Sequence, residues 1–172
     1  MPYVSIDELE RFEFHDAELI SIEQNEPCMK WITKGINATK ENTQNHFQFD
    51  MCVSESDVVF ESVEIKSITF AEIKTYNVNH ELIQHEKPRE ASKTDYTSIL
   101  NESTSAFCWI QGMCMEKAPA DGKHKYAATF TLDGCAGYFH ILLHFDRVVI
   151  SWNEFSGKAW YEDDTWKKKN DT

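Results

Sequence analysis

The sequence has few glycines and no long apolar run. Its six glycines are scattered through 172 residues, so we find no glycine-rich loop that could cradle a phosphate. No stretch approaches the roughly 20 apolar residues of a membrane-spanning helix. The first residues, Met1–Glu8, have neither the basic nor the apolar region of an export signal. We therefore expect a cytoplasmic protein that does not enter a membrane.

Positive charge is also scarce. The chain has 17 lysines and arginines against 29 aspartates and glutamates, which gives a formal net charge of −12. This balance argues against a basic surface for nucleic acid and against docking on anionic lipid. An acidic surface serves solubility, or it meets a basic protein partner. Of these two interpretations we favour solubility, and a basic partner is the alternative.

Cysteine and histidine spacings give no metal or disulfide motif. The cysteines are odd in number and form no Cys-x-x-Cys pair, which predicts free thiols in a reducing compartment: Cys28, Cys52, Cys108, Cys114 and Cys135. His140 and His144 lie in a strand pattern, where four residues span about 13 Å. They are therefore too far apart to bind one zinc ion, and we expect neither a metal nor another cofactor.

The region from Tyr126 to Trp152 has the clearest pattern, and it predicts antiparallel strands. A turn at Asp133–Gly137 separates two alternating runs, and Asp146-Arg147 predicts a tight reversal in which Phe145 pairs with Val148. With that pairing, one buried face comprises Ile141, Leu143, Phe145, Val148, Ile150 and Trp152. His140 and His144 fall on the opposite face.

Similar alternation predicts strands elsewhere. Phe12–Glu23 reads as a strand with a bulge near Asp16, and His46–Val53 as one that points Phe47, Phe49, Met51 and Val53 inward. Ser5 and Glu8 have the spacing of a helix capping box, which predicts a short helix over Ile6–Arg11. We therefore predict a mainly β fold, residues 1–172 forming one domain: an antiparallel β-sandwich or partly open β-barrel with a short N-terminal helix.

Two segments depart from this pattern. Residues 77–105 are polar and charged, and we expect a surface insertion with one helical turn at His80–His85. Connections of this length are usually functional or mobile. The tail at 167–172 is expected to be frayed.

Candidate binding residues are few. His15 next to Asp16 is either a paired site or a turn in which Asp16 caps a backbone amide, and we favour the turn. Trp152, Trp160 and Tyr161 either line a ligand cleft or close the end of the β core, and we favour the core. His140 and His144 are candidates for a partner-facing surface. No nucleophile–base spacing stands out, so we assign no catalytic residue.

The run Phe14–Ile22, the run Val148–Phe155 and the sequence Ala159–Tyr161 resemble parts of small bacterial β-rich families. Some of these families are immunity proteins encoded beside polymorphic or contact-dependent toxins. The resemblance implies a cytosolic binding protein without catalysis.

Three functional hypotheses follow. The first is a non-enzymatic bacterial binding protein of the immunity type, whose partner is a basic protein. The second is a small-molecule-binding β-barrel, or an enzyme built on one, with the C-terminal aromatic residues as its pocket wall. The third is a structural homo-oligomer formed through a sheet face. A deep cavity lined by Trp152 or Trp160 with a convergent polar group favours the second.

Overall fold

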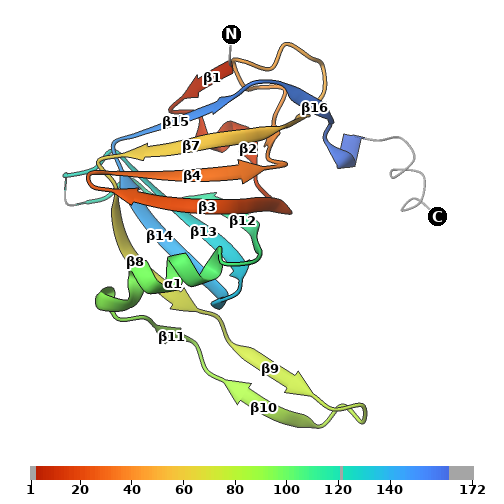
Figure 1. Cartoon of the computed structure of the whole chain (residues 1–172), viewed down its shortest axis with the longest axis vertical. Coiled ribbons are helices and arrows are strands. Elements are labelled where there is room, and N and C mark those ends of the chain that lie inside the picture. The colour runs from red at the N-terminus through yellow and green to blue at the C-terminus, as the bar shows by residue number, and fades with distance from the viewer. Residues whose placement is uncertain (1–2, 121, 163–172) are drawn as a thin grey trace.

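The computed structural model describes residues 3–120 and 122–162. Its main feature is a ten-stranded, wholly antiparallel sheet (Figure 1). In their order across the sheet the strands are β1 (Tyr3–Ile6), β15 (Arg147–Trp152), β7 (Glu55–Glu61), β4 (Cys28–Lys34), β3 (Ala17–Asn25), β12 (Cys108–Met115), β13 (Tyr126–Gly134), β14 (Gly137–Phe145), β8 (Glu64–Phe70) and β11 (Arg89–Glu90).

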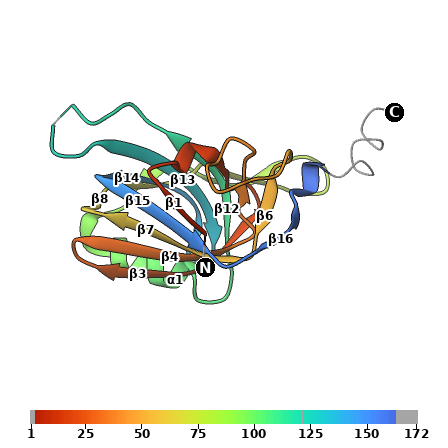
Figure 2. The same cartoon turned by 90° about the horizontal axis from the view of Figure 1, so that it is seen from above.

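This sheet folds over on itself at its middle. β3 and β12 pair through only two residue pairs, and the strands from β12 to β8 then pass behind those from β1 to β3 (Figures 1 and 2). The two halves enclose one core, in which Trp31 of β4 meets Phe130 of β13 with ring centroids 4.7 Å apart. Phe60 of β7 meets Phe145 of β14 at 5.2 Å. The predicted class, between a sandwich and an open barrel, is confirmed.

A second, four-stranded sheet covers one end of the core. Its strands are β16 (Phe155–Lys158), β6 (Met51–Val53), β5 (Asn37–Ala38) and β2 (Phe12–Glu13). One face turns Phe12, Ala38 and Val53 into the core. The chain then ends its described part in the 3-10 helix η3 (Trp160–Glu162).

The predicted hairpin at Asp146 is wrong, although the predicted buried face is right. β14 pairs with β13 and β8, whereas β15 pairs with β1 and β7. Asp146 carries the chain from one half of the sheet to the other, and its amide donates to the Glu61 carbonyl at 3.0 Å. Because both halves face the same core, the six predicted residues are all at most 2% exposed.

The N-terminal prediction needs two corrections. Ile6 belongs to β1, and the helix is one 3-10 turn, η1 (Leu9–Arg11). Phe47 and Phe49 do not point inward: they lie in a loop before β6 and are 51% and 39% exposed. Two residues of the alternating set, Met51 and Val53, are buried as expected. Period-two alternation determines which side chains are buried only in a strand, and residues 47–49 lie in a loop.

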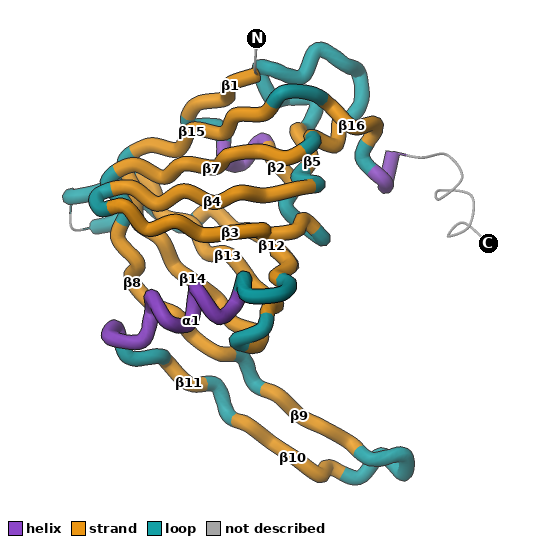
Figure 3. Tube along the Cα trace, in the orientation of Figure 1, coloured by secondary structure: helices purple, strands orange, loops and turns teal. Residues whose placement is uncertain are grey.

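Residues 77–105 contain regular structure (Figure 3). The strands β9 (Ile73–Tyr76) and β10 (Leu82–Glu86) form a projecting hairpin, so the helical turn expected at His80–His85 is wrong. After β11 come the 3-10 helix η2 (Lys93–Asp95) and the helix α1 (Tyr96–Ser103). None of the helices in the described part of the chain has the length and apolar character that a membrane span requires. The tail at 167–172 lies outside the described residues.

Candidate functional site

The four-stranded sheet carries an open cleft on the face turned away from the core. Its volume is about 510 Å³. It is lined by Glu13, His15, Thr39, Asp50, Trp160 and Tyr161. Three residues singled out from the sequence come together here, because the fold brings His15 close to the adjacent pair Trp160 and Tyr161.

Strand alternation explains how the polar side chains reach this face. Phe12 of β2 is buried in the core, so its neighbour in the strand, Glu13, points outward. His15 follows in the turn after β2 and is exposed. In the register of the sheet Glu13 lies opposite Asn37, which lies opposite Cys52. The outward face is therefore polar, and the inward face is apolar.

Asp50 fixes the C-terminal segment above this face. Its carboxylate accepts hydrogen bonds from the Lys40 amide at 2.8 Å and from the Tyr161 hydroxyl at 3.0 Å. Its carbonyl accepts from the Ala159 amide at 2.9 Å. Burial raises the pKa of the Tyr161 hydroxyl, and the hydrogen bond to Asp50 raises this pKa further. Tyr161 therefore stays protonated and acts as a hydrogen-bond donor, which does not suit it to be a general base.

Asn37 is the least expected polar group near the cleft. It is 1% exposed, and neither its amide nitrogen nor its amide oxygen has a partner within the described part of the protein. Asn37 lies opposite Glu13 in the register of the sheet, and directly opposed side chains lie about 5 Å apart. Its amide is therefore next to a cleft residue, although Asn37 is not itself among the lining residues. A buried amide without a partner is costly, and such groups call for a functional explanation.

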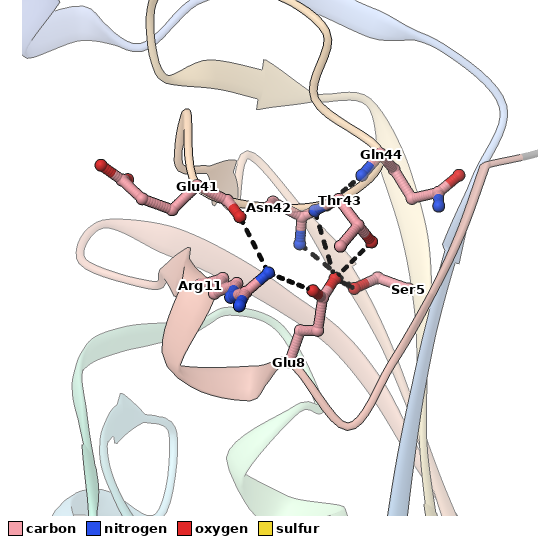
Figure 4. A network of polar contacts seen from close by, with 7 residues as sticks. All are labelled: Ser5, Glu8, Arg11, Glu41, Asn42, Thr43 and Gln44. Carbon is pink, nitrogen blue, oxygen red and sulfur yellow. Dashed lines mark hydrogen bonds and ion pairs between the residues drawn. The ribbon is translucent and has the colours of Figure 1, made fainter.

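The loop of residues 39–50, which carries Asp50, is held in place by polar contacts (Figure 4). Glu8 accepts from the Ser5 hydroxyl at 2.7 Å and from the Thr43 hydroxyl at 2.8 Å, and it also pairs with Arg11. Burial raises the pKa of Glu8, but these hydrogen bonds and Arg11 outweigh it and hold the pKa below its usual value. Ser5 and Glu8 thus anchor this loop instead of capping a helix.

A second anchor inside the loop is Asn45. Its amide nitrogen donates to the carbonyls of Ala38, Thr39 and Phe49, and its amide oxygen accepts from the Phe47 amide. These bonds give the loop a defined shape although it has no strand. The cleft wall is therefore preorganised.

The same loop also exposes two aromatic rings, Phe47 and Phe49. Phe47 packs edge-on against Phe155, with centroids 5.7 Å apart. The Lys158 ammonium lies 3.7 Å from the centre of the Phe49 ring. Neither ring lines the cleft, where the exposed aromatic ring is that of Trp160, 45% exposed. Sequence reasoning missed Phe47 and Phe49 as surface residues because their alternation resembled that of a strand.

His15 and Asp16 form an exposed turn. Asp16 has a φ of 63°, and the Ala17 amide donates to the Phe14 carbonyl at 3.0 Å. The His15 Nδ1 lies 3.0 Å from the Asp16 carboxylate, and both side chains are more than half exposed. His15 lines the cleft, whereas Asp16 is not among the lining residues.

The remaining candidate residues lie elsewhere. His140 Nδ1 and the Thr131 hydroxyl are 2.9 Å apart, and His144 lies beside His124, with ring centroids 5.9 Å apart. Both candidates are in β14, outside the cleft. Trp152 is 2% exposed, stacks on Tyr3 at 5.3 Å, and borders a separate, smaller cavity of about 320 Å³.

Comparisons with protein-family models, with curated proteins and with solved structures each find no match to the chain. What the cleft can do therefore follows from its own residues. Two carboxylates, a buried amide and exposed aromatic faces are the groups that recognise organic cations, through charge-assisted hydrogen bonds and cation–π contact.

Proposed function

We propose that this protein is a non-enzymatic, cytoplasmic binding protein whose partner is a basic protein. A lysine or arginine side chain of the partner enters the cleft. The observation that carries the proposal is the placing of Glu13 and Asp50 beside the exposed ring of Trp160. The resemblance to bacterial immunity proteins supports the same class of function, with a cationic toxin as the partner.

The net charge supports this proposal at longer range. At −12, the protein attracts a basic partner before contact, and complementary charge speeds such association. The screening length is about 8 Å at physiological ionic strength. Association therefore slows as salt is added.

The test uses a short fluorescent peptide rich in arginine and lysine, and a matched peptide rich in glutamate. Binding of the basic peptide is measured by anisotropy for the wild type, Glu13→Gln and Glu23→Gln. Glu23 is exposed at the far end of β3, so the two variants have the same net charge. We expect Glu13→Gln to weaken binding about three- to tenfold, since charged contacts at an interface contribute roughly 1 kcal/mol or more. Glu23→Gln should change it less than about twofold.

Equal losses in the two variants would show that the peptide binds the overall charge and not the cleft. Trp160→Ala gives a second readout that leaves the charge unchanged. This variant should weaken binding of the basic peptide about as much as Glu13→Gln does, because a cation–π contact contributes about 0.5–2 kcal/mol.

A small organic cation is the second candidate ligand. The volume of about 510 Å³ lies in the usual range for small-molecule sites. Thermal unfolding with a panel of small amines separates the candidates. A rise of the melting temperature with one amine, and none with the basic peptide, would replace the first proposal by this one.

A further inference from the structure

The hairpin β9–β10 projects from the body as an arm (Figures 1 and 3). Within the described residues its two strands pair only with each other, and every residue of both strands is exposed. A two-stranded hairpin alone is marginally stable in water. The arm therefore has both edges and both faces available for another chain.

The turn at the tip of the arm is held by hydrogen bonds and exposes one apolar side chain. The Asn77 side-chain oxygen accepts from the amides of Asn79 and Glu81, and its nitrogen donates to the Glu81 carboxylate. Val78, in this turn, is 95% exposed. Other apolar side chains on the arm are at least 40% exposed: Ile73, Tyr76, Leu82 and Ile83. Such a display suits contact with a protein surface.

The charge of the arm indicates what kind of protein surface it contacts. Residues 72–87 contain three acidic and two basic residues, so they carry −1 of the total of −12 and leave −11 to the rest. Glu72 is bonded within the arm to Lys74 at 2.8 Å and to His85 at 2.7 Å. A nearly neutral arm has little attraction for a basic partner, and it does not repel its own copy.

The β9 edge offers a regular row of backbone groups. The irregularity in this hairpin lies on β10, between Leu82 and Gln84, whereas β9 contains neither a bulge nor a proline. Proteins normally protect such an edge or cover it with another strand.

We propose that the arms of two copies pair β9 to β9 across a two-fold axis and form a four-stranded sheet. Centred on Thr75, this pairing places the two Thr75 residues opposite each other and Lys74 opposite Tyr76 of the second copy. Opposed threonines are favourable, whereas a register centred on Lys74 would oppose two lysines.

The geometry keeps the acidic bodies apart. Thr75 lies four residues after Ala71, at the base of the arm, which corresponds to about 13 Å of extended strand. The two bodies therefore stand roughly 26 Å apart, about three screening lengths at physiological salt. Repulsion between two bodies of charge −11 is then small.

Sedimentation velocity over a concentration series tests the proposal with Thr75→Lys and Gln84→Lys. Gln84 lies opposite Thr75 within the arm, so both variants add the same charge to the same face. The wild type should dimerise. Thr75→Lys, which opposes two lysines, should weaken the dimer at least about tenfold, and Gln84→Lys should weaken it much less. A wild type that stays monomeric at every concentration, or equal effects of the two variants, would overturn the proposal.

Cross-linking tests the register independently. In a Cys114→Ser background, Thr75→Cys should form an intermolecular disulfide, because opposed residues lie at 4.5–5.5 Å between Cα atoms, within disulfide range. In the proposed four-stranded sheet the two β10 strands are the outer strands. The thiols of Gln84→Cys are therefore separated by both β9 strands and should stay reduced. Equal cross-linking of both, or of neither, would contradict the β9 pairing.

Discussion

The β9–β10 arm and the helix α1 lie within 30 residues of each other, yet they are held in opposite ways. The sequence between Asn77 and Ser105 is predominantly polar, and both segments form regular structure. The arm is exposed along its whole length. Helix α1 turns Tyr96, Leu100 and Ser103 inward, where they are at most 6% exposed. Regular backbone bonding therefore does not distinguish the segments, but burial does.

This difference shows that packing against the body stabilises the short helix α1. Eight residues are too few for a stable isolated helix, and no side chain caps the start of α1 at Asp95. Three apolar side chains pack it against the body: Tyr96, Ile99 and Leu100. Its last turn binds the β13–β14 hairpin through the Ser103 carbonyl, which accepts from the Cys135 amide at 3.2 Å. The arm has no comparable attachment within the described residues.

The largest expected difference is between two leucines. Leu100 of α1 is 0% exposed and Leu82 of the arm is 50% exposed. We expect Leu100→Ala to lower the free energy of unfolding by about 2–5 kcal/mol, and Leu82→Ala by less than about 0.5 kcal/mol. Urea denaturation of both variants at low protein concentration, where the arms do not associate, measures this. Similar midpoints would mean that α1 contributes no more than the arm.

The next effect tests the attachment at the end of α1. A Cβ placed on Gly134 would lie 2.6 Å from the Ser103 carbonyl and 3.0 Å from the Cys108 sulfur, whereas one on Gly112 would meet nothing within 4 Å. Gly134→Ala should therefore cost about 1–3 kcal/mol through overpacking. Gly112→Ala should be close to neutral. A neutral Gly134→Ala would show that the hairpin and α1 separate without cost.

The sequence predicts the parts of this fold whose side chains alternate against a core. The six buried residues from Ile141 to Trp152 follow directly from period-two alternation, and so does the Asp133–Gly137 turn. The pairing of the strands does not follow, because alternation specifies a face and not a neighbour. Phe145 and Val148 face the same core from two halves of a folded sheet. The same alternating sequence is equally compatible with a hairpin, in which the two residues would pair directly.

The candidate site was predictable only in part. His15, Trp160 and Tyr161 are conspicuous residue types, but their approach depends on the small sheet and on Asp50. Asn37 gives no signal in the sequence, because its significance is its burial without a partner. The prediction that Phe47 and Phe49 are buried is wrong because they alternate with polar residues as in a strand but lie in a loop, whose shape is fixed by Asn45.

The smallest predicted effect concerns the loop of residues 39–50, which is intermediate between arm and helix: it is polar, yet fixed to the body by Glu8. Because the pKa of Glu8 is lowered in the folded protein, its contribution is present above the ordinary glutamate pKa of about 4.3 and is lost as the pH falls through the lower folded value. Glu8→Gln should cost on the order of 1 kcal/mol at neutral pH.

The pH dependence separates this contribution from a general loss of packing. The cost of Glu8→Gln should shrink below about pH 4 because the wild-type carboxylate is then protonated as well. Glu10→Gln is the matched control, since Glu10 is exposed in the same 3-10 helix, and it should be neutral at every pH. The measurement is the unfolding free energy of the three proteins in urea between pH 3 and pH 7. A cost of Glu8→Gln that stays constant across this range would show that the loop is held by shape and not by the Glu8 charge.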